Sequence, residues 1–344
     1  MPNSNINIII ESKVPFVKGL LDPYATVRYL DPEEITPKAV ENADGMIIRT
    51  RTVCNEQLLG RSKCKFIATA TIGTDHIDMP WCASRGITVV NAPGCNAPAV
   101  AQYVFGSIMQ TINRPLASHT IGIVGVGHVG SIVERWARAL DMRVLLCDPP
   151  RELAEGGDGW SDLATIAREA DIITFHTPLT AEGPYPTYHL VNEALLSSLK
   201  RTPILINSAR GAVFDTEAVV SAARKGLTGP LVIDCWEGEP AIDPALLELA
   251  AVATPHIAGY SREGKIRASQ QAVDAITTFF YLPRVTIDEP LPRAAARAVS
   301  APGIARSYNP LLEDSPALKA NPENFEILRN GYALRHEAEE GRID

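Results

Sequence analysis

Three polar residues in the second half of the chain have the side chains that oxidation of an alcohol requires. Arg210 lies in INSARGAVFD, Glu239 in DCWEGEP and His256 in TPHIAGYS, and each follows a strand-like segment. A histidine can accept the hydroxyl proton as a hydride leaves the carbon. A carboxylate can orient and charge the imidazole, and an arginine can bind a substrate carboxylate and polarise the forming carbonyl. The set therefore suits hydride transfer at an alcohol carbon.

Each of these residues also has an ordinary structural interpretation. His256 lies between a proline and an isoleucine and could be a hydrogen-bonded structural histidine. Glu239 precedes a proline and could be a solvated turn residue, and Arg210 could belong to a simple loop. The residues alone do not decide whether Glu239 or Glu237 is the carboxylate that faces the imidazole.

A glycine-rich segment, TIGIVGVGHVGSIVERW, has the G-x-G-x-x-G spacing at Gly125, Gly127 and Gly130. It follows an apolar strand-like run and opens an amphipathic helical pattern, the context that gives this motif its meaning. The first glycine permits a tight turn, the second lets a pyrophosphate approach the backbone, and the third allows the helix to pack closely on the strand. Free N–H groups at the start of the helix favour the same anion. The segment predicts a dinucleotide site.

Asp148 stands at the end of the next strand-like segment, 18 residues after Gly130. Its carboxylate can accept a hydrogen bond from a ribose 2′-hydroxyl and would repel a 2′-phosphate. This position favours NAD over NADP. Arg151 is a reason for caution, because a nearby arginine can accommodate the phosphate of NADP.

Short Ile- and Val-rich runs alternate with helical patterns, which predicts an α/β fold with parallel sheets covered by helices. The strands expected in the N-terminal block are Ile6–Ile10, Thr26–Leu30, Gly45–Arg49, Lys65–Thr69 and Ile87–Asn91. Those expected in the second block are Ile121–Val124, Arg143–Cys147, Asp171–Phe175, Pro203–Asn207 and Leu231–Cys235. Ligands of such sheets bind beyond the carboxyl ends of the strands, where the three polar residues are expected to converge.

Two long helices are expected beside the second block. One spans Asn96–Arg114, with Asn96 as its N-cap, and the other spans about Arg262–Tyr281. The proline-rich tail from Pro283 begins with a possible strand at Arg284–Ile287 and includes a short helix at Asn321–Arg329. Apolar residues persist in the tail, so we expect it to be ordered.

Composition limits the classes of function. The 344 residues are enough for two domains and leave room for a small third one. Net charge is −8 without a Lys/Arg block, which makes nucleic acid an unlikely partner, and no apolar run is long enough to cross a membrane. The six cysteines lie far apart without a metal-binding spacing, and the first residues lack the pattern of a secretory signal. We therefore expect no metal, and a cytoplasmic protein.

On the substrate side, Arg49 and Arg51 end an expected strand and point to opposite faces of it. Either could bind a phosphate or be a solvated surface residue. The loop at residues 71–74 offers hydroxyls and backbone N–H groups that suit an anion.

The segments GIVGVGHVG, INSARGAVFD, DCWEGEP and TPHIAGYS together resemble the D-2-hydroxyacid dehydrogenases. Other segments resemble one branch of that family, which oxidises a phosphorylated four-carbon hydroxy acid in the biosynthesis of pyridoxal 5′-phosphate. They are ATATIGTDHID, APGCNAPAVAQYV, LLCDPPR, FHTPLTAEGPYPTYHL and HIAGYSREGKIR. YNPLLED and FEILRNGY in the tail resemble the dimerisation region of the same branch.

The resemblance implies a Rossmann-type cofactor domain inserted in a flavodoxin-like substrate domain, followed by a small α+β dimerisation region. The domains expected are a substrate domain at residues 1–95, an NAD domain at 96–258, a returning helix at 259–283 and the dimerisation region at 284–344. The implied partners are NAD, a small phosphorylated hydroxy acid and a second copy of the chain.

The resemblance also assigns site residues. Catalysis falls to Arg210, Glu239 and His256. Together with the fingerprint, cofactor contacts fall to Gly125, Gly127, Val129, Gly130, Asp148, Thr177, Ser208, Ala209, Arg210, Asp234 and Gly259. Substrate contacts fall to Thr50, Thr71 and Tyr260, with Arg49 added from the strand argument above.

Two other hypotheses stay open at this point. The same chemistry could act on another acid, such as 3-phosphoglycerate or glyoxylate. The chain could also be a non-catalytic NAD(H)-responsive binding protein, although such a protein would not need to keep a general base.

Overall fold

The computed structural model describes residues 6–289 and 301–338. Within these residues the chain forms two compact units. The first comprises residues 6–96 and 262–289, and the second comprises residues 97–261 and 301–338. The C-terminal region expected at residues 284–344 falls partly outside the described residues.

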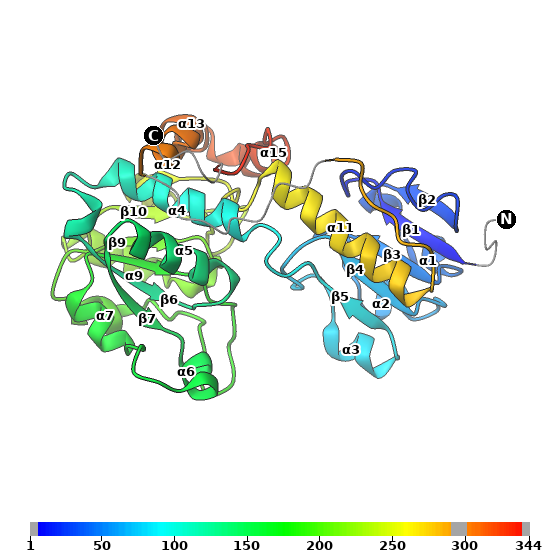
Figure 1. The fold of residues 1–344 in the computed structure, drawn as a ribbon, viewed down its shortest axis with the longest axis horizontal. Coiled ribbons are helices and arrows are strands. Elements are labelled where there is room, and N and C mark those ends of the chain that lie inside the picture. Colours follow the sequence, from blue (N-terminus) through cyan, green and yellow to red (C-terminus); the bar gives the residue numbers. More distant parts are fainter. Residues whose placement is uncertain (1–5, 290–300, 339–344) are drawn as a thin grey trace. The chain divides into compact units, whose positions relative to one another are not determined.

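The first unit is built on a five-stranded parallel sheet with the strand order β2-β1-β3-β4-β5 (Figure 1). Its strands are β1 (Asn7–Glu11), β2 (Thr26–Leu30), β3 (Gly45–Ile48), β4 (Phe66–Thr69) and β5 (Thr88–Val90). Every residue of the central strands β3 and β4 is buried, because helices cover both faces of the sheet.

The helices of the first unit pack on alternate side chains of these strands. On one face, Val273 and Ile276 of α11 (Arg262–Phe279) share a core cluster with Ile47. The other face carries α1 (Pro37–Val40), α2 (Glu56–Leu59) and α3 (Met79–Ser84), which pack around Met46 and Ile48. Each of these fully buried aliphatic side chains contributes about 1.5–3 kcal/mol to folding.

The second unit contains a six-stranded parallel sheet with the strand order β11-β10-β9-β8-β6-β7. Its strands are β6 (Thr120–Val124), β7 (Arg143–Cys147), β8 (Ile172–Phe175), β9 (Ile204–Asn207), β10 (Leu231–Ile233) and β11 (Ala250–Ala253). The chain runs outward from β6 in one direction to β7 and in the other direction from β8 to β11. The order therefore reverses between β6 and β8, the point where α/β sheets open a crevice for ligands.

Helices cover both faces of this second sheet as well. On one face lie α4 (Ala97–Thr111) and α5 (His128–Ala139), where the rings of Phe105 and Trp136 are 5.8 Å apart. On the other face lie α7 (Leu163–Glu169), α8 (Glu193–Ser198), α9 (Thr216–Arg224) and α10 (Pro244–Leu249). The short helix α6 (Pro149–Glu155) follows β7.

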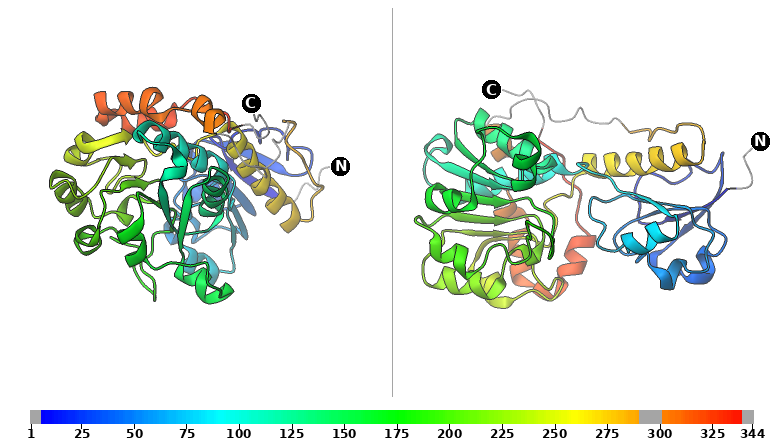
Figure 2. Two further views of the ribbon diagram at one scale, coloured as in Figure 1. Left: turned by 60° about the vertical axis from the view of Figure 1, so that its left-hand side comes forward. Right: turned by 90° about the horizontal axis from the view of Figure 1, so that it is seen from below.

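The C-terminal helices, coloured orange to red, pack against this second unit (Figures 1 and 2). They are α12 (Ala301–Ser307), α13 (Pro310–Glu313), α14 (Ser315–Ala320) and α15 (Phe325–Asn330). Ile304 and Tyr308 join the core on the α4 face, and Leu318 and Phe325 join the core on the α9 face. The expected α+β region differs here, since residues 301–338 form helices and only one isolated β-bridge, between Arg335 and Ser261.

Three local expectations are wrong. Residues 284–287 form no strand, because the side chain of Gln270 bonds to Val285 O and to Ile287 N and takes the place of a neighbouring strand. Asn96 does not cap α4, since its buried side-chain oxygen finds no donor among the described residues. The helix expected at 321–329 is split into a 3₁₀ turn at Pro322–Asn324 and α15.

Most of the strands agree with those predicted from the sequence. The ten expected strands match β1 to β10 to within two residues. The sequence did not predict the eleventh strand, β11. All six cysteines are buried free thiols, and no helix in the described part of the chain is long and apolar enough to cross a membrane.

Gly211 offers a test of how tightly the loops at the carboxyl end of the second sheet are packed. A Cβ atom at this position would overlap the backbone of Trp236 and Glu237, whereas a Cβ at Gly159 would meet open space. We expect Gly211→Ala to destabilise the protein by about 1–3 kcal/mol or more, because backbone atoms cannot move aside as a flexible side chain can. Thermal unfolding should show a melting temperature roughly 2–10 °C lower, with Gly159→Ala close to wild type. Equal melting temperatures for the two variants would contradict the packing described here.

Candidate active site

The residues expected to bind the cofactor and to carry the chemistry lie at the carboxyl ends of the six strands of the second unit, with Asp148 directly after β7. The fingerprint glycines follow β6, and Thr177 follows β8. Ser208, Ala209 and Arg210 follow β9. Asp234 follows β10, and His256 follows β11. Because parallel strands end at the same edge, one sheet brings all of them to one side of the unit.

The glycine turn after β6 has the geometry that the motif requires. Gly125 has a φ of +86°, and a Cβ there would lie 2.8–2.9 Å from the backbone of residues 176 and 177. A Cβ on Gly130 would overlap the carbonyl of Gly125, so the first turn of α5 can approach the strand only without a side chain at this position. Gly127 precedes α5 and faces open space, which leaves its backbone accessible to a ligand.

Two buried hydroxyls beside this turn fit a cofactor. The Oγ atoms of Thr177 and Ser208 are buried, and neither finds a hydrogen-bond partner within residues 6–289 and 301–338. Buried polar atoms are normally paired, so an orphaned pair at the end of neighbouring strands points to a polar ligand. The residues present therefore fit a dinucleotide. Val129 lies in α5 and packs against the core, while Ala209 and Gly259 lie in the turns after β9 and β11.

Asp148 caps α6 and also bonds to the glycine turn. Its Oδ1 accepts from Arg151 N at 3.1 Å, and its Oδ2 accepts from Val126 N at 2.8 Å. The guanidinium of Arg151 donates to Glu155 at 2.7 and 3.0 Å and to Val126 O at 2.5 Å. Because Arg151 is already paired with a carboxylate, it is less available to bind the 2′-phosphate of NADP.

Asp234 organises the loop that carries His256. This carboxylate is 1% exposed and accepts hydrogen bonds from Thr254 Oγ1 at 2.7 Å, Ile257 N at 2.8 Å and Ala258 N at 3.0 Å. The N–H of His256 donates to the carbonyl of Asp234 at 2.9 Å. His256 itself has a φ of +57°, a left-handed backbone that the surrounding hydrogen bonds must hold in place.

Glu239 and His256 form a close pair. His256 Nδ1 lies 2.6 Å from Glu239 Oε1, and the other oxygen of Glu239 accepts from Trp236 N at 3.1 Å. Nδ1 is thus the ring nitrogen that faces the carboxylate, which leaves Nε2 to act on a substrate. Both side chains are roughly a quarter exposed, so the pair borders solvent or a ligand.

The surroundings keep Glu239 ionised. Burial by itself raises the pKa of its carboxyl, but the hydrogen bond and charge of His256, the N–H of Trp236 and the charge of Arg329 outweigh it. The net result is a pKa of Glu239 below its ordinary value. A carboxylate held in this way stabilises a positive charge on the imidazole.

The structure separates the two carboxylates that the sequence left as alternatives. Glu237 does not face His256; its Oε1 lies 2.5 Å from Nε2 of His189, and its Oε2 accepts from Thr216 N at 3.2 Å. The same imidazole has Nδ1 3.8 Å from Asp215. Glu239 is therefore the carboxylate beside His256.

Arg210 lies in the turn after β9. Its Nη1 donates to the carbonyl of Ala209 at 2.9 Å, and the side chain of Asn207 holds this turn by donating to the carbonyl of Arg210 at 3.0 Å. Asn207 is buried and was not among the residues singled out from the sequence. It fixes the backbone from which the guanidinium extends.

The predicted substrate residues Arg49, Thr50 and Thr71 lie in the first unit. Arg49 donates from its backbone N to Glu11 at 2.9 Å and from Nη1 to Lys13 O at 3.0 Å. Thr50 is exposed, and Thr71 Oγ1 donates to Gly73 O at 3.1 Å. Glu11, the last residue of β1, was missed by sequence analysis; it is 1% exposed and holds the turn that carries Thr50.

Two arginines of the C-terminal segment reach the same end of the second unit. The buried guanidinium of Arg335 donates to the carbonyls of Ile257 at 3.0 Å and Tyr260 at 3.1 Å and to that of Ala258. Arg329 Nη1 lies 3.8 Å from Glu239 Oε1. Sequence analysis missed both residues, because nothing in the tail's local pattern marks them.

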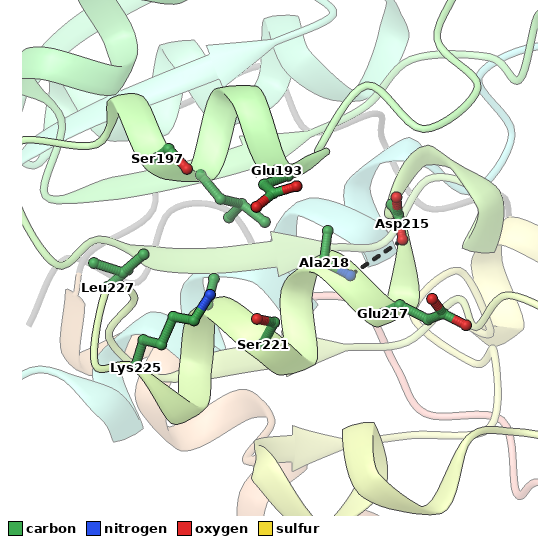
Figure 3. A pocket seen from close by; sticks show the side chains of 10 residues that line it. Glu193, Ser197, Asp215, Glu217, Ala218, Ser221, Lys225 and Leu227 are labelled. Carbon is green, nitrogen blue, oxygen red and sulfur yellow. Dashed lines mark hydrogen bonds between the residues drawn. The ribbon is translucent and has the colours of Figure 1, made fainter.

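A pocket of about 260 Å³ lies between α8 and α9 (Figure 3). Its lining includes Glu193, Asp215, Glu217 and Lys225. Not one of the ten residues that line it belongs to the predicted cofactor, substrate or catalytic set, so it is distinct from the site described above.

Comparisons with known proteins identify the class of this protein. The family described as D-isomer specific 2-hydroxyacid dehydrogenase, NAD binding domain, matches residues 101–258. A solved D-lactate dehydrogenase from Aquifex aeolicus, complexed with NAD and lactic acid, has a TM-score of 0.69 and 28% identity, over 80% of this chain and 96% of that chain. The fold and the site thus define an NAD-dependent dehydrogenase, a class whose substrates are small hydroxy acids.

Similarity over nearly the whole chain narrows this class. The erythronate-4-phosphate dehydrogenase of Bacteroides fragilis is 45% identical over 98% of this chain and 99% of its own. That of Bacteroides thetaiotaomicron is 46% identical over 96% of this chain and 97% of its own. The chain belongs to the erythronate-4-phosphate dehydrogenase family.

Replacement of Glu239 tests the pair that it forms with His256. We expect Glu239→Gln to lower kcat by about 10²–10⁴-fold, because an amide cannot stabilise the charged imidazole as a carboxylate does. The carboxylate also contributes stability, which is present above its ordinary pKa of 4.5 and is lost as pH falls through the lower pKa of the folded state. The melting temperature of the wild type should therefore exceed that of the variant near neutral pH, and the difference should shrink below about pH 4.5. A difference that stays constant through acid pH would show that Glu239 is not held as described.

Proposed function

We propose that this chain catalyses the NAD-dependent oxidation of 4-phospho-D-erythronate to (R)-3-hydroxy-2-oxo-4-phosphooxybutanoate, a step of pyridoxal 5′-phosphate biosynthesis. The observation that carries the proposal is the His256–Glu239 pair, 2.6 Å apart, at the end of a sheet that belongs to an NAD-binding domain. The choice of substrate is supported by the full-length similarity to erythronate-4-phosphate dehydrogenases.

The chain's own residues supply acid–base chemistry and charge. Nε2 of His256 accepts the proton of the C2 hydroxyl, and Glu239 accepts the Nδ1–H and stabilises the imidazolium that forms. Arg210 binds the substrate carboxylate and polarises the carbonyl oxygen as it forms at C2. When bound, NAD supplies the acceptor for the hydride that leaves C2. In the reverse direction the imidazolium returns its proton to the same oxygen.

The remaining site residues are assigned to binding. The cofactor contacts proposed are those named from the sequence, with the glycine turn at the pyrophosphate, Asp148 at a ribose hydroxyl, and the orphaned hydroxyls of Thr177 and Ser208 as two further donors. Thr50, Thr71 and Tyr260 are assigned to the substrate, together with Arg49.

The division of the chain into two compact units supports separate assignments for the cofactor and for some of the substrate-binding residues. We assign the cofactor to the second unit, which contains the fingerprint. Of the residues assigned to the substrate, Arg49, Thr50 and Thr71 belong to the first unit, which α11 completes, and Arg210 and Tyr260 belong to the second. We also propose that the chain forms a homodimer through its C-terminal region and that it acts in the cytoplasm. Sedimentation of the purified protein tests the dimer.

The substrate is tested by following NADH formation with a panel of acids. We expect the highest kcat/KM with 4-phospho-D-erythronate and much lower values with 3-phosphoglycerate and D-lactate, and reduction of glyoxylate by NADH should likewise be slow. His256→Gln should lower kcat by at least about 10²-fold because the general base is lost, while NADH binding, followed by fluorescence, stays within about twofold.

A clear preference for another acid would overturn the proposed substrate but not the reaction class. NAD binding without turnover of any acid would instead favour a binding protein. Wild-type turnover by His256→Gln would remove His256 from the mechanism.

A further inference from the structure

A guanidinium from the C-terminal segment lies beside the His256–Glu239 pair. Arg329 belongs to α15, and its Nη1 is 3.8 Å from Glu239 Oε1 and 3.5 Å from Glu326 Oε1. Tyr260, which follows His256 by four residues, is near enough to the side chain of Arg329 to raise the pKa of its guanidinium. All of these groups belong to the second unit.

One hydrogen-bond donor of the Arg329 guanidinium has no partner. Its Nε is buried, and no acceptor for it exists in the described part of the chain. The side chain as a whole keeps 20% of its surface exposed. An unsatisfied buried donor on a cation is costly, and a bound anion would satisfy it.

The charges around Arg329 leave it positive. Burial by itself lowers the pKa of its guanidinium, but Tyr260, Glu239 and Glu326 outweigh burial and raise the pKa above its ordinary value. Glu239 makes its close contact with His256, 2.6 Å away, and its contact with Arg329 is longer. Arg329 is therefore not neutralised by a short ion pair with this carboxylate.

The proposed substrate carries two anionic groups, and of the two arginines already assigned to it, Arg210 and Arg49, only Arg210 has a stated anionic partner. The Nε of Arg49 is buried without an acceptor among the described residues, as that of Arg329 is. Arg210 is assigned to the carboxylate, and the net charge of −8 gives the phosphate no general attraction. A planar guanidinium with an unused Nε–H suits the bidentate recognition of a phosphate. Tyr260, which lies near Arg329, adds a second polar group from the residues already assigned to the substrate.

We propose that Arg329 binds the 4-phosphate of the substrate and determines the preference for a phosphorylated acid over its unphosphorylated analogue. The proposal rests on the function proposed above. It makes the C-terminal segment part of the substrate site and places a specificity-determining residue outside the segments that carry the NAD chemistry.

The experiment compares kcat/KM for 4-phospho-D-erythronate and for D-erythronate in wild type, Arg329→Gln, Arg329→Lys and Arg306→Gln. Arg306 is an exposed arginine of α12 and serves as the matched control. Arg329→Gln should lower kcat/KM for the phosphorylated acid by about 10–100-fold, mainly through KM, and leave that for D-erythronate within about threefold. Arg329→Lys should recover part of the loss because it keeps the charge, and Arg306→Gln should match wild type.

Two results would overturn the proposal while the proposed function stands. Equal losses on the two acids would mean that Arg329 acts through Glu239 or on folding. Unchanged kcat/KM values for both acids would mean that it does not bind the phosphate. If the wild type does not oxidise 4-phospho-D-erythronate, the proposed function fails first and the role of Arg329 falls with it.

Discussion

The buried carboxylate of Asp234 is the constraint on which the site depends. Asp234 directly follows β10, and its carboxylate accepts hydrogen bonds from Thr254 Oγ1 and from the N–H groups of Ile257 and Ala258. The backbone carbonyl of Asp234 accepts a hydrogen bond from the N–H of His256. Burial raises the pKa of Asp234, and the charge of His256 and these hydrogen bonds oppose that shift. A buried acid is expensive unless it is paired, so the loop must close around it. That closure fixes His256 in its left-handed conformation and brings Nδ1 within 2.6 Å of Glu239.

The C-terminal segment holds the same loop from its other side. Asp234 satisfies N–H groups of the loop, and Arg335 satisfies the carbonyls of Ile257, Ala258 and Tyr260. The guanidinium of Arg335 is buried and stacks on Tyr308 at 4.2 Å, which makes it a rigid support rather than a surface contact. The tail therefore belongs to the architecture of the site, whatever further role it has in assembly.

Local sequence patterns were sufficient to predict most of the fold and part of the site. The strands, the glycine turn and the positions of Arg210 and His256 could be predicted because hydrophobic periodicity and a short motif determine them. Contacts between distant segments could not. The pairing of Glu237 with His189, the buried Glu11, and both Arg329 and Arg335 depend on which loops meet in space. The cap expected at Asn96 is not formed, and Pro98 at the second helical position does not explain this, because Asp148 caps α6 with Pro150 at the same position.

The central claim is that a hydride leaves C2 of the substrate while His256 takes the hydroxyl proton. It is tested most directly with 4-phospho-D-erythronate that carries deuterium at C2, incubated with the protein and NAD. The account predicts that the deuterium appears in the NADH, measured by mass spectrometry, and that none is released to water. Release of deuterium to water, or NADH without deuterium, would contradict direct hydride transfer and with it the assigned roles of His256 and Glu239.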